Sequence, residues 1–370
     1  MEKRPYRVLQ VVTIMNRGGI ETMIMNHYRA IDRTKIQFDF LVHRQEKGDY
    51  DDEIEQLGGR IYRALPIRPW KYFQYFKWLK DFFYQQHNYI AVHSHIHENS
   101  GFVFKYANLY NIKNLLCTSH IAIKFIDYKI IFRLYAKYYL NKYCSKRLAC
   151  GDIAGKYLYG NKPFTVIKNA INTSDFVFNK NIRNQIRAEL GITNNFVIGN
   201  VARFSPQKNH KFIMNLFKEI LAIDNNVILV LVGCGEKEKD IKELAVQYGI
   251  SDNIKFLGLR KDINRLLQSF DIFLFPSLYE GLPVSIIEAQ AAGLPCILSD
   301  TIDSETAITS NVEFHSLNAP ISEWTNAILN KKNFKRVDTS SNIIDAGYDV
   351  IHNTKNLIDL YTTNSQNNSY

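Results

Sequence analysis

The sequence predicts an α/β protein made of two doubly wound domains that face each other across a cleft. Short apolar runs alternate with longer amphipathic stretches, a pattern typical of parallel sheets covered by helices on both faces. At roughly 150 residues per domain, the 370 residues would form two or three domains. A polar, turn-rich stretch at residues 168–176 (KNAINTSDF) marks the expected domain boundary.

In the first half, residues 6–14 (YRVLQVVTI) predict a buried strand, and residues 20–31 predict the helix that follows it. Further β-rich runs predict strands at residues 38–42, 89–93 and 114–117. We assign residues 1–170 to a first domain.

The second half continues the alternation over residues 171–345, which we assign to a second domain. Its apolar runs predict strands at residues 196–201, 227–232, 254–257, 272–275 and 295–298. Amphipathic stretches between them predict helices at residues 211–223, 237–248 and 263–269. In open sheets of this kind, ligands bind beyond the carboxyl ends of the strands. The residues that carry chemistry are therefore expected in strand-to-helix loops.

Composition excludes several classes of protein. With 46% hydrophobic and 22% charged residues, the chain is neither disordered nor fibrous. No apolar stretch approaches the roughly 18 residues of a membrane-spanning helix, and the N-terminus lacks the pattern of a secretory signal. The five cysteines form no C-x-x-C pair, which favours free thiols in a reducing compartment. We expect a cytoplasmic protein.

The net charge of +10 originates in the first half of the chain. Residues 60–170 contain 18 Lys and Arg but only 4 Asp and Glu, which suggests an anionic partner. Residues 68–84 and 125–147 interleave aromatic side chains with Lys and Arg, as in a helix lying on a membrane interface. Each such cation would contribute about 1 kcal/mol at an anionic leaflet. We predict peripheral binding to the inner face of the plasma membrane through these two segments.

One other interpretation of these segments stays open. The aromatic side chains could belong to the core, with the cations on a solvated helix face. Nucleic-acid binding is not expected, because no recognisable binding motif accompanies the charge.

The sharpest motif spans residues 276–288 (PSLYEGLPVSIIE). A strand ends at Pro276, a loop holds Glu280 and Gly281, and Pro283 is expected at the first position of the next helix. The exposed amides and positive dipole of that helix start would suit a diphosphate. Glu280 and Glu288 are too far apart to act on one bond, but they could hold hydroxyls on either side of such a group.

Two further loops follow predicted strands. Arg203 and Lys208 (RFSPQK) supply a guanidinium fork and a point charge that would neutralise a leaving diphosphate. Gly18 and Gly19 would let the backbone pass close to a ligand. Their spacing matches neither a dinucleotide fingerprint nor a P-loop, and an ordinary turn is an alternative.

Histidines end two strands of the first half, His93 and His95 in VHSH and His120 in CTSH. No other ligand stands at metal-binding spacing from them. They are either buried and hydrogen-bonded or line the cleft, where His120 would bond a sugar or a phosphate. Asp49-Tyr50-Asp51 has the D-x-D form of some metal-binding transferases, but its polar surroundings predict a solvated loop. We assign no metal.

These motifs together resemble glycosyltransferase family 4, whose fold, GT-B, consists of two Rossmann-like domains. The resemblance covers nearly the whole chain, is closest to bacterial capsular and exopolysaccharide enzymes, and includes GGIE, VHSH, NAIN, VLVGCGE, KFLGLRKDI and SFDIFLFPSLYEGLPVSIIEAQAAGLP. Glu280 and Glu288 match the family's E-x7-E pattern with the flanking Gly-Leu-Pro. Residues 346–370 resemble its final helix, which crosses back to the first domain, followed by a polar tail.

The resemblance implies a retaining, metal-independent hexosyltransferase that needs no cofactor. Its donor would be a UDP-hexose or UDP-N-acetylhexosamine bound mainly by the second domain, residues 171–345. Its acceptor would be a lipid-linked saccharide in cell-surface polysaccharide synthesis, bound by the first domain, residues 1–170. The residues implied in catalysis are Arg203, Lys208, Glu280 and His120. Those implied in donor binding are Gly18, Gly19, Arg203, Lys208, Gly233, Gly258, Glu280, Gly281, Leu282, Pro283, Val284 and Glu288.

The chain departs from the family at the interdomain link, which usually reads P-N-G-I-D. Here Lys168 and Ala170 replace the Pro and Gly, and Asn172 replaces the Asp. Two other functions are compatible with the motifs: a nucleotide-sugar epimerase or hydrolase on the same fold, and a non-catalytic subunit that recruits a partner to the membrane.

Overall fold

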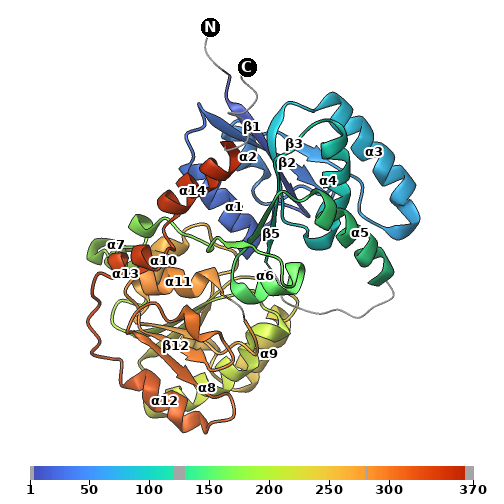
Figure 1. Ribbon diagram of the computed structural model, residues 1–370. Helices are drawn as coiled ribbons and strands as arrows, with labels where there is room; N and C mark the ends of the chain where they lie inside the picture. Colours follow the sequence, from blue (N-terminus) through green and yellow to red (C-terminus); the bar gives the residue numbers. More distant parts are fainter. Residues whose placement is uncertain (1–3, 121–129, 281, 363–370) are drawn as a thin grey trace. The chain divides into compact units, whose positions relative to one another are not determined.

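The computed structural model describes residues 4–120, 130–280 and 282–362. The chain divides into two compact units (Figure 1). The first consists of Met1–Ala170 together with Val350–Tyr370, and the second of Ile171–Asp349. Each unit contains one parallel sheet with helices packed on it, so the predicted class of parallel α/β structure with two doubly wound units is confirmed.

The first unit has a seven-stranded sheet in the order β3-β2-β1-β4-β5-β6-β7. Its strands are β1 Tyr6–Val12, β2 Ile36–Val42, β3 Ile61–Arg63, β4 Tyr89–Ser94, β5 Leu115–Ser119, β6 Lys146–Ala149 and β7 Thr165–Val166. Its helices are α1 Gly19–Ala30, α2 Asp51–Gln56, α3 Tyr72–Gln85, α4 Ser100–Leu109, α5 Ile130–Tyr143, α6 Asp152–Tyr159 and α14 Val350–Thr362.

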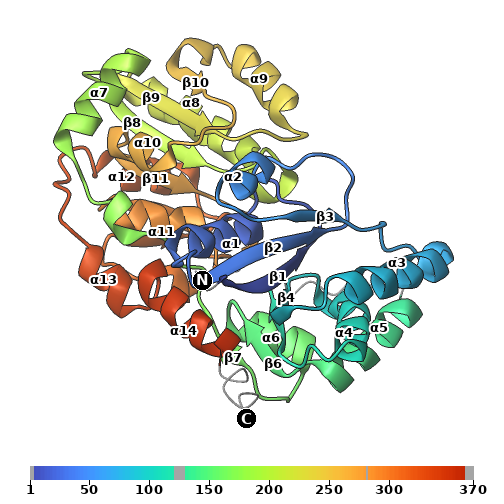
Figure 2. The ribbon, with the colours of Figure 1, turned by 90° about the horizontal axis from the view of Figure 1, so that it is seen from above.

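Both faces of this sheet are buried, which explains why its strands are almost continuously apolar. Successive side chains of β1 point to opposite faces. Val8 and Val12 therefore pack in one cluster with residues of α1, α2 and α14, whereas Leu9 and Val11 pack in another with residues of α3, α4, α5 and α6. Figure 2 shows α3, α4 and α5 lying together in the first unit.

Helix α14 is the last described helix of the chain and belongs to the first unit. It buries Leu357 and Tyr361 in the cluster that contains β1. The Tyr361 hydroxyl accepts a hydrogen bond from the Gln10 amide at 3.1 Å and contacts His93 Nδ1 at 2.8 Å. The Asn114 amide donates to the carbonyls of Leu360 and Tyr361. These bonds anchor the last turns of α14 to the sheet of the first unit.

The second unit has a six-stranded sheet in the order β10-β9-β8-β11-β12-β13. Its strands are β8 Phe196–Val201, β9 Val227–Val232, β10 Ile254–Phe256, β11 Ile272–Phe275, β12 Cys296–Ser299 and β13 Val312–His315. Its helices are α7 Lys180–Leu190, α8 His210–Ile223, α9 Glu238–Gln247, α10 Ile263–Ser269, α11 Val284–Ala291, α12 Ile321–Leu329 and α13 Ser340–Asp345. Residues of α7, α10, α11 and α13 cover one face, and residues of α8, α9 and α12 cover the other.

The prediction for residues 125–147 is wrong at its C-terminal end, and residues 125–129 lie outside the described part of the chain. Helix α5 stops at Tyr143, and Lys146 and Arg147 belong to strand β6. The Ser145 amide donates to the Leu115 carbonyl at 2.9 Å, so the chain joins β5 where the charge pattern suggested a helix. The Lys146 ammonium donates to the Leu360 carbonyl.

The apolar face predicted for residues 68–84 is wrong in its second half. Leu79 and Phe83 are fully buried in the core, and Phe76 packs against it. The apolar and aromatic side chains of this segment that are mainly exposed are Trp70, Phe73 and Tyr84, at 67%, 84% and 70%. The spacing of the apolar residues in the second half of α3 therefore reflects packing of this helix against its own sheet. This agrees with the alternative interpretation, in which the aromatic side chains belong to the core.

No described helix combines the length and the apolar character that a bilayer crossing requires.

Candidate functional site

The carboxyl ends of β8 and β11 carry the most closely built group of predicted site residues. The two strands are neighbours in the sheet, so the loops that follow them lie at one edge. The Leu278 amide donates to the Gln207 carbonyl at 2.8 Å, and the Gln207 side chain donates to the Tyr279 carbonyl at 2.9 Å. The Asn209 side chain donates to the Pro276 carbonyl at 3.1 Å. These three bonds fix the loop after β8 against the loop after β11.

Lys208 and Glu280 meet between these loops and form an ion pair. Their side chains are only 18% and 9% exposed, so the pair is held away from bulk solvent. The Lys208 ammonium also lies 4.8 Å from the centre of the Phe275 ring, and Glu280 forms a parallel bridge with Ile302. An ammonium has three donors, so Lys208 can hold Glu280 and still donate to an anionic ligand.

Helix α11 begins beside this pair and adds backbone amides. Pro283 is its N-cap and Val284 its first residue, so the expectation that Pro283 occupies the first helical position is wrong by one residue. The Pro283 carbonyl accepts from the Ile286 amide at 3.1 Å. The backbone N–H groups of Val284 and Ser285 lie at the start of the helix, where they have no intrahelical acceptor. They form the positive end of the helix dipole. Leu282 packs against the core, and Gly281 lies outside the described residues.

Glu288 lies inside α11, and burial raises the pKa of its carboxyl to about 7. Among the described residues its carboxylate has no hydrogen-bond partner. Near neutral pH both protonation states are populated, so this group can accept hydrogen bonds from hydroxyls or donate one. Glu280 and Glu236 at this edge of the sheet each pair with a cation, whereas Glu288 has no cation beside it among the described residues.

Arg203 is held differently from Lys208. Its side chain is 72% exposed and pairs with Glu236 at 3.1 Å. The loop after β9, which contains Gly233 and Gly235, packs tightly against the loop after β8. A Cβ at Gly233 would lie 2.1 Å from the Ala202 carbonyl oxygen, and a Cβ at Gly235 would lie 2.4 Å from the Phe204 carbonyl oxygen. The Gly258 carbonyl accepts from the Gly233 amide at 2.9 Å. Gly233 and Gly258 therefore shape the loop that carries Glu236.

His210 belongs to this edge and was missed by the sequence analysis. It is the first residue of α8, is almost fully buried, and stacks on Phe204 with ring centres 4.2 Å apart. Burial, with a smaller effect of the Lys208 charge, lowers its pKa to about 4. Neither ring nitrogen has a hydrogen-bond partner among the described residues. Its position two residues after Lys208 is the signal that could have identified it.

In the first unit, the predicted histidines form a buried hydrogen-bonded network. His95 Nδ1 lies 2.9 Å from His120 Nε2, and His95 Nε2 lies 3.1 Å from Gln10 Oε1. His93 contacts the Thr118 hydroxyl at 2.7 Å. Burial lowers the pKa of His93 and of His120 to about 3. All three are therefore neutral at pH 7, and His120 keeps one nitrogen, Nδ1, without a partner among the described residues.

The glycines after β1 differ from each other. Gly18 is the N-cap of α1, and a Cβ there would lie 2.4 Å from the Glu21 carboxylate. A Cβ at Gly19 would meet nothing within 4 Å. The backbone at Gly19 is thus open to approach, whereas Gly18 is covered by Glu21.

The carboxylates of the D-x-D sequence have protein partners. Asp49 accepts from the Arg17 amide at 3.0 Å, and Asp51 accepts from the Gly48 amide at 3.0 Å and pairs with Arg63. Within the described ranges, no group of three or more His, Cys, Asp or Glu side chains has the arrangement of a metal site.

Comparison with known proteins decides the family. The family model described as "Glycosyl transferases group 1" matches residues 182–315. Over 383 aligned residues the chain is 33% identical to a putative glycosyltransferase, EpsF, of Bacillus subtilis, with 99% of both proteins covered. The chain is a group 1 glycosyltransferase. The matched region contains Arg203, Lys208, Glu280 and Glu288.

Other relatives of this glycosyltransferase are more distant. It is 28% identical over 302 residues to the capsular polysaccharide biosynthesis glycosyltransferase CapH of Staphylococcus aureus, covering 77% of this chain and 78% of that protein. It is 32% identical over 237 residues to an Escherichia coli enzyme named UDP-Gal:alpha-D-GlcNAc-diphosphoundecaprenol alpha-1,3-galactosyltransferase, covering 59% and 60% of the two chains.

Solved structures identify the fold of this glycosyltransferase as GT-B. Anabaena HepE in complex with UDP superposes with a TM-score of 0.78 at 18% identity, covering 96% of this chain and 100% of that one. WaaG, from lipopolysaccharide biosynthesis, superposes with a TM-score of 0.67 at 15% identity, covering 97% and 98%.

Proposed function

We propose that this glycosyltransferase transfers a sugar from a UDP-sugar to a lipid-linked saccharide during assembly of a cell-surface polysaccharide. The observation that carries the proposal is the buried pair of Lys208 and Glu280 beside the first amides of α11. The relatives support the pathway, since CapH is named for capsular polysaccharide biosynthesis. The E. coli relative is named for a UDP-galactose donor and a diphosphoundecaprenol-linked acceptor, and HepE was solved with UDP.

In this proposal each group of the second unit has a distinct role. Lys208 and the amides of Val284 and Ser285 bind the diphosphate, Glu288 accepts from the ribose hydroxyls, and Glu280 accepts from hydroxyls of the transferred sugar. Arg203 would exchange Glu236 for a phosphate. That exchange costs little, because an exposed ion pair contributes only about 0.2–1 kcal/mol.

The remaining predicted donor contacts are proposed from the family resemblance. They are Gly18, Gly19 and His120 of the first unit, and Gly233, Gly258, Gly281, Leu282 and Pro283 of the second. Gly19 has the open backbone that close approach of a ligand requires.

We propose that transfer retains the anomeric configuration and needs no metal. The bond from the sugar to the diphosphate breaks, and the negative charge develops on the departing diphosphate. Preorganised donors that point at this charge stabilise the transition state in a site shielded from water. The Lys208 ammonium and the α11 amides are such donors.

The experiment is a product analysis with a panel of labelled UDP-sugars and a synthetic polyprenyl diphosphate that carries one sugar. We expect one UDP-sugar to give a lipid product longer by one α-linked sugar, with equal rates in EDTA. Glu280→Ala serves as the control for the site. UDP and a rearranged sugar formed without acceptor would identify an epimerase instead. No turnover of any donor by the parent protein would favour the non-catalytic subunit.

We further propose that the first unit binds the cytoplasmic face of an anionic membrane through the starts of α3 and α5. The two starts adjoin, because the rings of Tyr72 and Phe132 pack with centres 5.7 Å apart. Exposed apolar and aromatic side chains of the α3 and α5 regions include Trp70, Phe73, Ile131, Leu134 and Tyr138. Lys71, Lys77 and Lys80 of the α3 region are exposed as well. Exposed apolar groups among cations are typical of a membrane-interface surface.

Reversing the charge of Lys71, Lys77 and Lys80 to Glu should release the protein from phosphatidylglycerol-containing vesicles. Each lysine contributes about 1 kcal/mol at an anionic surface, so binding should fall by at least 100-fold. Vesicle sedimentation at about 0.15 M salt measures the binding. At this salt concentration charges interact only within roughly 8 Å, so the assay reports cations that lie close to the membrane. The matched control reverses Lys211, Lys218 and Lys239 of the second unit. Equal binding of the two triple variants would contradict the proposed surface.

A further inference from the structure

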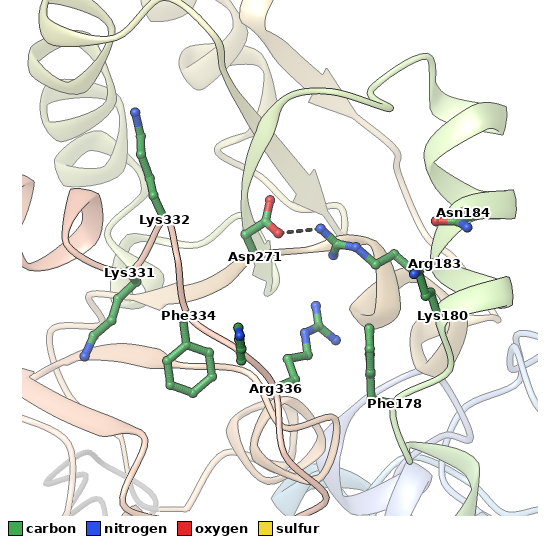
Figure 3. A pocket seen from close by; sticks show the side chains of 10 residues that line it. Phe178, Lys180, Arg183, Asn184, Asp271, Lys331, Lys332, Phe334 and Arg336 are labelled. Atoms are coloured by element: carbon green, nitrogen blue, oxygen red, sulfur yellow. Dashed lines mark hydrogen bonds and ion pairs between the residues drawn. The ribbon is translucent and has the colours of Figure 1, made fainter.

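A pocket rich in cations lies in the second unit, at the opposite end of β11 from Lys208 and Glu280 (Figure 3). Asp271 lines it and immediately precedes β11, whereas Glu280 follows that strand. The pocket has a volume of about 340 Å³ and lies between the start of α7 and the segment that follows α12. None of its lining residues belongs to the proposed donor site.

Cations greatly outnumber carboxylates in this pocket. Its lining includes six Lys and Arg side chains but one carboxylate, Asp271. Lys331 and Lys332 have other partners, Glu313 and Asp224, and Figure 3 shows their ammonium groups directed away from Arg336. The four cations left to the pocket are Lys180, Arg183, Lys335 and Arg336.

The single carboxylate is already shared between two guanidiniums. Asp271 pairs with Arg183 at 2.5 Å and with Arg187, which lies behind the pocket, at 2.8 Å. It also accepts from the Val197 amide at 2.8 Å. Asp271 therefore has little capacity left to compensate Arg336.

Arg336 has no carboxylate partner among the described residues. Its guanidinium donates to the carbonyls of Leu267 and Gln268 at 3.1 and 3.2 Å and lies 4.7 Å over the Phe178 ring. Burial, reinforced by repulsion from Arg183, lowers its pKa to about 9. A guanidinium loses pKa when its charge lacks compensation in a poorly solvated place. This side chain would gain from a nearby anion.

The guanidiniums are held in place before any ligand arrives. Arg183 donates to the Phe270 carbonyl at 2.8 Å, and Arg336 donates to the same oxygen. The carbonyls of Leu267 and Gln268 lie in the last turn of α10, and that of Phe270 lies just after the helix. Carbonyls at a helix end lack intrahelical donors, so the guanidiniums bond them. Fixed donors lose less conformational entropy on binding than mobile ones. Lys180 and Lys335 are exposed at the pocket and have no ion-pair partner within the described ranges.

We propose that this pocket binds a small phosphorylated molecule through its phosphate group, independently of the donor site. Arg336 and Arg183 supply fixed guanidiniums, and Lys180 and Lys335 supply mobile charges that can close on the phosphate oxygens. Phe334 adds an apolar wall next to the charges. The volume is in the range of small-molecule sites, about 300–1,000 Å³. The anion would supply the compensation that Asp271 does not.

Isothermal titration with inorganic diphosphate tests the proposal in a Lys208→Ala background, which weakens the donor site. We expect about one bound diphosphate per chain. Adding Lys180→Ala and Lys335→Ala should weaken this binding at least tenfold, whereas adding the control pair Lys211→Ala and Lys239→Ala should not. The guanidiniums are left intact because their contacts with carbonyls support the fold.

Titrations with inorganic phosphate and with sugar phosphates separate the free anion from a phosphate ester as the natural ligand, and either one binding at the pocket supports the proposal. Equal binding with and without Lys180 and Lys335 would overturn it. So would complete displacement by chloride at equal ionic strength, which would indicate an adventitious ion only. Absence of any binding would mean that the guanidiniums serve only to cap α10.

Discussion

Replacing Lys208 with Ala should lower kcat for sugar transfer by roughly 10²–10³-fold, equivalent to about 3–4 kcal/mol of transition-state stabilisation. The reason is the placement of the ammonium, which is held by Glu280 at the carboxyl ends of β8 and β11 and shielded from solvent. In such a poorly solvated place the electrostatic interaction between one ammonium and the departing diphosphate is stronger than it would be in water. Initial rates of UDP release with saturating donor and acceptor measure the effect.

The substitution also leaves Glu280 without its cation, and this structural effect has to be separated from the catalytic one. Breaking a buried ion pair costs about 3–5 kcal/mol of stability because one charge stays uncompensated. The double variant Lys208→Ala with Glu280→Gln removes that charge. It should recover stability in urea unfolding without recovering the rate.

The matched control is Lys211→Ala, an exposed lysine three residues further along the chain, which should keep the parent rate. A Lys208→Ala rate within threefold of the parent would refute the role of Lys208. Such a result would leave the α11 amides as the principal donors to the diphosphate.

Acid should unfold the first unit before the second. Burial lowers the pKa of His27 and His43 to about 4 and of His93 and His120 to about 3. In the unfolded chain each would titrate near 6.5. The unfolded state therefore binds more protons once the pH falls below 6.5, and the stability of the first unit decreases from there toward the folded pKa values.

The expected size of this effect exceeds an ordinary stability margin. Each buried histidine removes about 1.4 kcal/mol per pH unit, so these four together remove about 8 kcal/mol between pH 6.5 and pH 5. A folded domain has about 5–15 kcal/mol. His95, whose pKa is also lowered by burial, adds to the loss.

The second unit contains two opposing groups. His210 has a folded pKa of about 4 and loses stability in acid in the same way. Glu288 has a folded pKa of about 7, above its unfolded value near 4.3. Its folded form binds the extra proton between these values, so it gains stability as the pH falls through 7. The two effects nearly cancel at pH 5, and the second unit should stay folded.

Hydrogen exchange with peptide resolution at pH 7.5 and pH 5, after correction for the intrinsic rate, measures the two units separately. We expect β1, β4 and β5 to lose protection at pH 5 while β8, β9 and β11 keep it. His27→Gln should remove one proton from the uptake on unfolding. Equal losses of protection in both units would refute the assignment.

Much of the fold could be predicted because its strands carry their own pattern. Five runs of the second half correspond to β8, β9, β10, β11 and β12 to within one residue at each end. The strands that were missed, β3, β6, β7 and β13, are two to four residues long and contain charged or polar side chains. Of these, β3, β7 and β13 lie at sheet edges. Such short strands are recognisable only through their neighbours, as β6 is through its pairing with β5.

The sequence by itself determined the fold class and the position of the site along the chain. Apolar runs buried on both faces of a sheet permit little other than parallel α/β structure, and the Glu280 loop with the start of α11 is a local pattern. Only the tertiary structure decided which charges meet. Lys208 and Glu280 are 72 residues apart, whereas Arg203 pairs with Glu236 and both Arg183 and Arg187 pair with Asp271. Ion pairing depends on which side chains converge in the folded chain and on how far water is excluded around them. Neither can be predicted from the residues adjacent in the sequence.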